Sequence, residues 1–174
     1  MNKQGLSLVV TTLILVMLVF VAIGIVWAVV SNLINDNLDQ SEACFNIFDK
    51  VSINSLYTCN NYSVNKLQFA IEIGDAEIDE ILVSVANSGQ SKNFKIKSQE
   101  SIIQYLTDYT GGNSVKLPGK NEGKTYFFNS QSAGFTDPND PIKNIKIAPI
   151  IEGYQCDVSD TLDTIDNCMS LLSN

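Results

Sequence analysis

The sequence predicts an α+β protein, in which a long N-terminal hydrophobic α-helix is followed by an antiparallel β-sandwich or barrel-like head domain with a short C-terminal helix. Two observations support this class. The chain begins with a long apolar run, and much of the remainder consists of short segments in which alternate residues are apolar, separated by Gly, Pro and Asn. After the apolar run about 140 residues remain, which is the usual size of one domain.

The N-terminal helix is predicted from the 25 residues between Leu6 and Val30, none of which is charged. At ~1.5 Å per residue they form a helix of about 37 Å, which exceeds the ~30 Å of bilayer hydrocarbon. The apolar region of a secretory signal is shorter, at about 7 to 15 residues. Because Lys3 precedes the run and Asp36 and Asp39 follow it, we expect a membrane-inserted chain with its N-terminus in the cytoplasm and the residues after about 35 outside the cell.

The helix is expected to continue outward as an amphipathic helix as far as residue 55. The apolar residues in this part recur at spacings close to a helical stripe, which would let the outer helix lie along a folded domain. These residues are Ile34, Leu38, Phe45, Phe48 and Val51.

Composition limits the partners and the chemistry. The chain has 11 basic and 19 acidic residues and a net charge of −8, which disfavours nucleic acid or an anionic lipid surface as a partner. It contains no histidine and no arginine, so it lacks the commonest general base and metal ligand and the bidentate phosphate clamp. We therefore expect no enzymatic activity, no catalytic residues, no cofactor and no metal site.

The four cysteines, Cys44, Cys59, Cys156 and Cys168, predict two disulfides in an exported domain. None belongs to a C-x-x-C pair of the kind found in zinc ribbons, and four buried free thiols are the alternative. Three pairings are possible. The local pairing joins Cys44 to Cys59 and Cys156 to Cys168, which closes loops of about 14 and 11 residues and contributes roughly 3 kcal/mol for each loop.

Strands are predicted where apolar residues alternate with polar ones. Residues 66–73, KLQFAIEI, place their apolar side chains on one face. Residues 77–97, EIDEILVSVANSGQSKNFKIK, contain two further segments around the turn sequence NSG, with Ile81, Val83 and Val85 alternating before it and Phe94 and Ile96 after it, and these are expected to pair as a hairpin. Residues 114–129 indicate strand, turn and strand, and residues 141–151 indicate a further strand in which Pro149 favours an edge position.

Helical spacing occurs twice after residue 100. Ile102, Ile103 and Leu106 predict a short helix that stops at Gly111 and Gly112. In the tail, five apolar residues with spacings of three and four predict the C-terminal helix. They are Val158, Leu162, Ile165, Met169 and Leu172. The aspartates at positions 157, 160, 163 and 166 would spread around that helix, so we interpret them as a solvated surface rather than a calcium site.

The sequence NYS at residues 61–63 suggests one modification. It is an N-x-[ST] sequon in a polar loop that follows Cys59. In an exported protein such a loop presents the acceptor amide to solvent, so Asn61 is a candidate for N-glycosylation.

The N-terminal sequence KQGLSLVVTTLILV resembles the start of archaeal type IV pilin-like proteins, in which a short charged leader ends in glycine and a hydrophobic helix follows. The order of parts over the whole chain is also similar to that family, as are head segments such as LPGKNEGKTYFFN and IKIAPIIEGYQCDVSD. Bacterial pilins carry a glutamate five residues into the mature helix. This chain has Val10 there, which resembles the archaeal type.

The resemblance implies that residues 1–5 are a leader (class III signal) peptide, 6–55 the N-terminal helix and 56–174 an extracellular β-rich head domain. A prepilin peptidase would cut between Gly5 and Leu6. The mature subunits would leave the membrane with the pilus assembly machinery and form a helical homo-oligomeric surface filament for adhesion or cell contact, with no nucleic acid partner. The alternative is a single-pass, membrane-anchored extracellular binding domain that does not polymerise.

Overall fold

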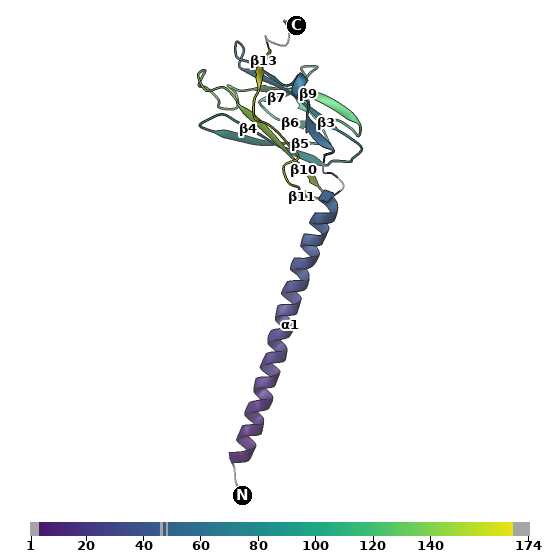
Figure 1. Ribbon diagram of the computed structural model, residues 1–174, viewed down its shortest axis with the longest axis vertical. Helices are drawn as coiled ribbons and strands as arrows, with labels where there is room; N and C mark the ends of the chain where they lie inside the picture. Colours follow the sequence, from purple (N-terminus) through teal and green to yellow (C-terminus); the bar gives the residue numbers. More distant parts are fainter. Residues whose placement is uncertain (1–3, 46, 48, 169–174) are drawn as a thin grey trace. The chain divides into compact units, whose positions relative to one another are not determined.

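The computed structural model describes residues 4–45, 47 and 49–168. It contains one long helix, α1 (Gln4–Phe45), followed by a domain of β-strands (Figure 1). The chain divides into two compact units, Met1–Ser41 and Glu42–Asn174. The predicted α+β class, with a long N-terminal apolar helix before a β domain rich in antiparallel pairs, is confirmed.

The helix ends earlier than predicted, at Phe45 rather than at residue 55. Ile47, which follows it, is buried in the core of the β domain. Strand β1 (Val51–Ile53) then pairs with strand β3 (Lys66–Ile73), and its first residue lies opposite Ile73. Val51, the last of the apolar residues that suggested a longer helix, is therefore buried in a sheet, where its backbone hydrogen bonds are also satisfied. Phe48 lies outside the described residues.

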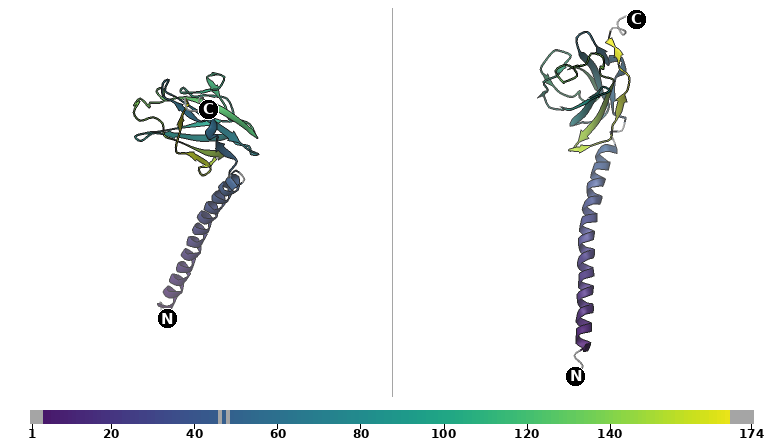
Figure 2. Two further views of the ribbon diagram at one scale, coloured as in Figure 1. Left: turned by 45° about the horizontal axis from the view of Figure 1, so that its top comes forward. Right: turned by 90° about the vertical axis from the view of Figure 1, so that its left-hand side faces the viewer.

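The strands form two larger sheets and one small one (Figure 2). Sheet A contains β1, β2 (Cys59–Asn61), β3 (Lys66–Ile73), β7 (Leu106–Asp108), β9 (Glu122–Asn129) and β13 (Asp166–Asn167). Sheet B contains β4 (Glu80–Ala86), β5 (Ser91–Lys97), β10 (Asn144–Ile151), β11 (Tyr154–Gln155) and β12 (Asp160–Leu162). The small sheet pairs β6 (Ser101–Ile102) with β8 (Ser114–Val115), and a short 3₁₀ helix, η1 (Ser55–Tyr57), precedes β2.

The order of strands in sheet A is β13-β2-β3-β9-β7, with β1 also paired to β3. The order in sheet B is β11-β10-β4-β5, with β12 also paired to β10. Among these pairs, β13 with β2 is parallel and the others are antiparallel. Both sheets contribute buried residues to one apolar core. Its aromatic part includes Phe69 of β3, whose ring stacks on that of Tyr126 of β9 at 5.4 Å between centroids.

Five predicted strands have the position or the pairing that the sequence indicated. Strand β3 covers residues 66–73, and β4 and β5 pair as a hairpin around NSG. Residues 114–129 supply β8 and β9 with a turn between them. Alternation places Ile81, Val83 and Val85 of β4 in the core, because successive side chains of a strand point to opposite faces.

Pro149 is not on an edge strand, since β10 has β4 on one side and both β11 and β12 on the other. The proline lies opposite Ile81 of β4, and its carbonyl accepts a hydrogen bond from the N–H of Cys156. β12 pairs with residues 145–147 of β10, and β11 pairs with residues 150 and 151. Pro149 thus falls in the gap between two short partners, where its missing N–H costs no ladder bond.

The first of the two short helices predicted after residue 100 is wrong, while the C-terminal helix stays a prediction, because the backbone is helical at Cys168, the last described residue. Residues 101–108 form β6 and β7 instead, and Leu106 is buried in the core as the first residue of β7. The tail forms β12 and β13 rather than a helix over residues 157–167. Met169 and Leu172, which were also assigned to the C-terminal helix, lie outside the described residues.

Candidate functional site

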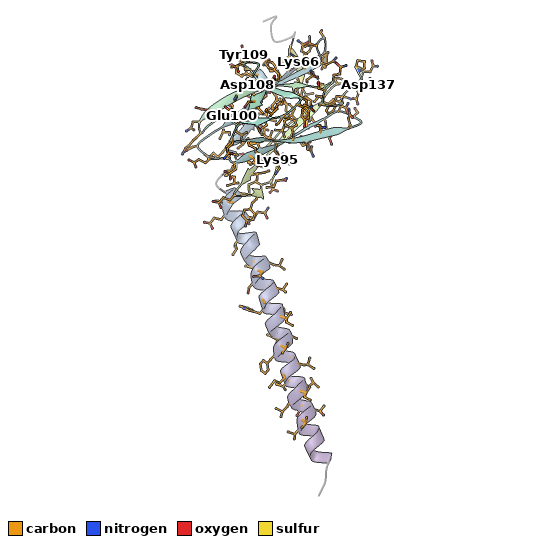
Figure 3. All side chains as sticks on the ribbon, turned by 180° about the vertical axis from the view of Figure 1, so that it is seen from behind. Lys66, Lys95, Glu100, Asp108, Tyr109 and Asp137 are labelled. Atoms are coloured by element: carbon orange, nitrogen blue, oxygen red, sulfur yellow. A yellow bond between two sulfur atoms is a disulfide. The ribbon has the colours of Figure 1, made fainter. Side chains whose placement is uncertain are left out.

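The first candidate site is the apolar part of α1, Val9–Ile34, which contains no charged residue. Its large apolar side chains project from every side of the helix (Figure 3), and they range from 41% exposed at Val30 to 73% at Trp27. At ~1.5 Å per residue this segment is long enough to cross the ~30 Å hydrocarbon layer. A helix that is apolar all round needs lipid or other apolar helices as neighbours. It fits a membrane-inserted or secreted protein.

The predicted cleavage position lies in the first turn of the same helix. The backbone of Gly5 and of Leu6 is helical. The first N–H groups of a helix lack partners within the helix, and terminal turns therefore fray readily. A peptidase that binds its substrate as an extended chain would require this first turn to unfold. Cleavage between these two residues remains a prediction.

The cysteines form two disulfides, and no cysteine in the described part of the chain is free. Cys44 bonds to Cys156, with 5.5 Å between the Cα atoms, and Cys59 bonds to Cys168, with 4.9 Å. The local pairing, of Cys44 with Cys59 and of Cys156 with Cys168, is therefore wrong. Loop length favoured it, but the fold brings the tail back to the start of the head domain, and each bond spans more than a hundred residues.

The two bonds together join two segments at both of their ends. Residues 44–59 and residues 156–168 thereby form one covalent circuit, which we call the disulfide ring. The two segments also contact each other between the bonds, where the N–H of Ile53 in β1 donates to Oδ2 of Asp160 in β12 at 2.7 Å. Since β1 belongs to sheet A and β12 to sheet B, the ring fastens one sheet to the other along this side.

The second part of the ring, residues 156–168, passes from one sheet to the other, and we call it the C-terminal strap. Its strand β12 pairs with β10 of sheet B, and its strand β13 pairs with β2 of sheet A. Leu162, at the end of β12, and Ile165, just before β13, pack against the core. Two of the apolar residues that suggested a helical face therefore pack on the core from the segment that joins the two sheets.

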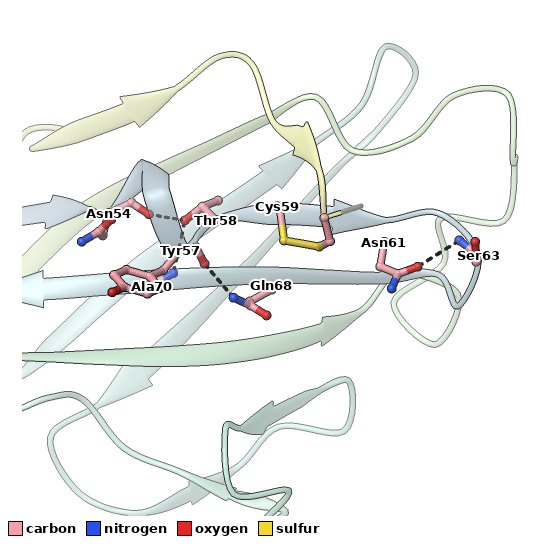
Figure 4. The surroundings of a disulfide bond; sticks show 9 residues. Asn54, Tyr57, Thr58, Cys59, Asn61, Ser63, Gln68 and Ala70 are labelled. Carbon is pink, nitrogen blue, oxygen red and sulfur yellow. Dashed lines mark hydrogen bonds between the residues drawn. A yellow bond between two sulfur atoms is a disulfide. The ribbon is translucent and has the colours of Figure 1, made fainter. Parts of the chain in front are cut away.

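The sequon lies next to the second disulfide (Figure 4). Asn61 is the last residue of β2, and its amide oxygen accepts a hydrogen bond from the N–H of Ser63 at 3.2 Å. The turn residue Tyr62, between them, is exposed. The amide nitrogen, to which a glycan would attach, takes no part in that bond. Glycosylation of Asn61 remains a prediction.

A surface cavity of about 420 Å³ has three acidic residues in its lining, Glu77, Asp79 and Glu122. Two of these carboxylates accept backbone hydrogen bonds: Asp79 accepts from the N–H of Glu152 at 2.8 Å, and Glu122 accepts from the N–H of Gly119 at 2.9 Å. Within the described residues, no group of three acidic or cysteine side chains is placed to hold a metal ion.

Electrostatic interactions in the head domain fix turns. The hydroxyl of Thr110, together with the backbone N–H of Gly112 and the ammonium of Lys124, lowers the pKa of Asp108. The distances from Oδ1 of Asp108 are 2.6 Å to the hydroxyl and 3.0 Å to the Gly112 nitrogen. Burial raises the pKa of Tyr126, whose hydroxyl donates to the carbonyl of Lys116 at 2.7 Å. These interactions hold the turn at residues 108–112 and join β9 to the segment that contains Lys116.

No protein-family model, curated protein or solved structure matches the chain. Sequence reasoning identified the exposed helix and the four cysteines, but it missed the disulfide ring. The sequence places two cysteines near the start of the head domain and two near its end, but this placement does not determine which cysteines pair.

Proposed function

We propose that this chain is a structural subunit of an archaeal type IV pilus-like surface filament, with a head domain of β-sandwich type. The observation that carries the proposal is the 26-residue helix Val9–Ile34, apolar on every side and exposed, attached to a disulfide-bonded β domain. Such a helix is stable either in lipid or among copies of itself, so it can pass from a membrane into the core of a filament without contact with water.

In this proposal the head domain forms the outer surface of the filament, and its disulfides and the negative charge of the chain suit that role. Its core is closed by two disulfides, which suit an oxidising environment outside the cell. The chain carries a net charge of −8, which keeps fibres soluble and apart from one another. In this proposal the precursor is inserted in the membrane, the prepilin peptidase removes residues 1–5, and the mature chain polymerises at the cell surface for adhesion or cell contact.

The alternative is a single-pass anchored domain that binds a ligand and does not polymerise. One observation favours it: the ring of Tyr109, 73% exposed, stacks on that of Phe127 at 6.1 Å between centroids, on the outer side of sheet A. Tyrosine is enriched at binding interfaces, where its ring supplies apolar contact area and its hydroxyl can form a hydrogen bond. The same pair would serve equally as an adhesive surface on a filament, so it does not displace the first proposal.

The decisive experiment compares the N-terminus and the assembly state of the native protein. For a filament subunit, mass spectrometry of material sheared from cells gives a mature chain that begins at Leu6, and electron microscopy of the same material shows fibres. A Gly5→Val variant would then stay uncleaved in the membrane and give no fibres. A chain that keeps residues 1–5 and is recovered only as membrane-bound monomers would refute the proposal and support the anchored domain.

A further inference from the structure

One edge of sheet B is basic. Strand β5 has a single neighbouring strand, β4, and so forms an edge of the sheet (Figure 1). Its charged residues are all lysines: Lys92, Lys95 and Lys97. Among the residues that the structure describes, the edge has no further backbone partner along most of its length, although the carbonyl of Lys97 accepts a hydrogen bond from the N–H of Leu117. We call this strand the lysine edge.

The positive charge of the lysine edge is only partly compensated within the chain. Lys95 and Lys97 both contact the carboxylate of Glu80, at 3.1 and 3.3 Å, and one carboxylate cannot neutralise two ammonium groups. Each of these lysine side chains is about half exposed, at 50% and 55%. The ammonium of Lys92 lies 5.2 Å from the ring centroid of Tyr105 and forms no ion pair within the described residues.

The opposite edge of the same sheet is acidic. It is formed by β11 and β12, which lie on the far side of β10 from β4. Residues 152–163 contain four acidic residues and no lysine. Three of these, Glu152, Asp157 and Asp163, are exposed and form no ion pair in the described part of the chain. We call these three residues the acidic edge.

The charges restrict how two copies of the head domain can meet. Two lysine edges that faced each other would place ammonium groups opposite ammonium groups, which is destabilising, and two acidic edges would repel in the same way. A lysine edge that faces an acidic edge brings opposite charges together. Because the two edges lie on opposite sides of one sheet, this contact leaves a free edge of each kind and can repeat without closing, as a helical filament requires.

We propose that, in the filament, the lysine edge of one head domain contacts the acidic edge of the next copy. The inference rests on the proposed function and names the surface through which its subunits recognise each other. The occupant of the lysine edge is a second copy of this chain, identified by charge complementarity. Val158, 54% exposed beside Asp157, adds an apolar contact within the acidic edge.

Charge reversal in a filament-producing host tests the contact. Lys95→Glu with Lys97→Glu, and separately Asp157→Lys with Asp163→Lys, should each lower the yield of sheared filaments at least about tenfold, since each puts like charges opposite one another. Combining all four substitutions restores opposite charges and should bring the yield back to within about threefold of the wild type. The control is Lys50→Glu with Lys66→Glu, which changes the net charge by the same amount as the Lys95→Glu and Lys97→Glu variant. Both positions lie outside sheet B, so the control should leave the yield unchanged.

Cross-linking gives an answer that does not depend on how the variants fold. Filaments assembled from a mixture of isotope-labelled and unlabelled wild-type subunits would be treated with a carbodiimide, which couples an amine directly to a carboxylate. We expect peptides that join Lys95 or Lys97 of one copy to Asp157 or Asp163 of another, recognised by their mixed isotope composition. Wild-type filaments that lack this link, with reversal variants that assemble normally, would overturn the contact while leaving the filament proposal intact. A wild-type chain that forms no filaments would reject both.

Discussion

Cys44 in the last turn of α1 is bonded to Cys156, which follows β11, although 112 residues separate them in the sequence. The bond fixes the end of the helix to the segment that leaves sheet B. A pull on the helix is therefore carried into the head domain by a covalent bond as well as by the chain around residue 47.

Removal of either disulfide should lower the free energy of unfolding of the head domain, but by less than the number of residues between its two cysteines suggests. A loop of about a hundred residues corresponds to about 4.7 kcal/mol, but with the other bond intact each disulfide closes only the disulfide ring, an effective loop of about 30 residues worth about 3.5 kcal/mol. Cys44→Ser with Cys156→Ser should lower the free energy of unfolding by about that amount. Urea titration of the full chain in detergent measures it through the near-ultraviolet circular dichroism of tyrosine, since the single tryptophan lies in the helix.

The matched variant, Cys59→Ser with Cys168→Ser, should have a similar effect because its bond completes the same ring. Peptide mapping without reduction supplies the control, and should join Cys44 to Cys156 in the wild type. A peptide that joins Cys44 to Cys59 would show that the disulfide ring does not form.

The aromatic core should be sensitive to truncation. Phe69 is fully buried and its ring contacts those of Phe94 and Tyr126. Phe69→Ala should lower the free energy of unfolding by about 3–5 kcal/mol, because it removes apolar contacts and leaves a cavity. Tyr109→Ala, at an exposed position, should change it by less than about 0.5 kcal/mol. Equal effects of the two variants in urea titration would contradict the placement of Phe69 in the core.

Asp108 should make the stability of the head domain depend on pH. Its pKa lies below the ordinary value of 3.8, chiefly because the Thr110 hydroxyl donates to its carboxylate. A carboxyl group with a lowered pKa stabilises the folded state above its ordinary pKa, and the stabilisation is lost as the pH falls through the folded-state value. Asp108→Asn should therefore be less stable than the wild type at pH 7, with a difference that shrinks below pH 3.8. Thermal unfolding at several pH values measures this, and a constant difference would contradict the assignment.

The apolar surface of α1 should tolerate little charge at its centre. Each lysine there costs roughly 2.5–3.5 kcal/mol of insertion free energy, so Val19→Lys with Ile23→Lys costs about 5–7 kcal/mol, comparable to the whole gain from the apolar residues. The fraction of full-length chain in the membrane should fall sharply after alkaline extraction. Asn32→Lys, near the end of the segment, is the control, since a lysine there can extend its ammonium group to water. Retention of the double variant in the membrane would argue against a spanning helix.

Sequence patterns predicted the strands and the helix that have the same surroundings along their whole length. β3 alternates over eight residues because one face meets the core throughout, and the hairpin of β4 and β5 follows from two such runs around a turn. The exposed helix was equally predictable, because a long apolar run without charge is typical of a helix that can span a membrane.

Prediction failed where tertiary contacts override the local period. The spacing of Val158, Leu162 and Ile165 is helical, yet the strap between its two cysteines is stretched across the seam of the sheets and two of these residues pack on the core as extended chain. Val51 likewise joined a sheet whose partner strand lies about twenty residues away. Such pairings, like the cysteine connectivity, are decided by distant residues that no local window contains.

The disulfide ring also sets an order of events in biosynthesis. In the proposed exported precursor, each cysteine of the first segment would wait for a partner more than a hundred residues later in the chain, so neither bond could form until most of the head domain had crossed the membrane. Oxidation would then follow the export of residues 44–168. A step that admitted only fully oxidised chains to the proposed filament would exclude those that are half exported.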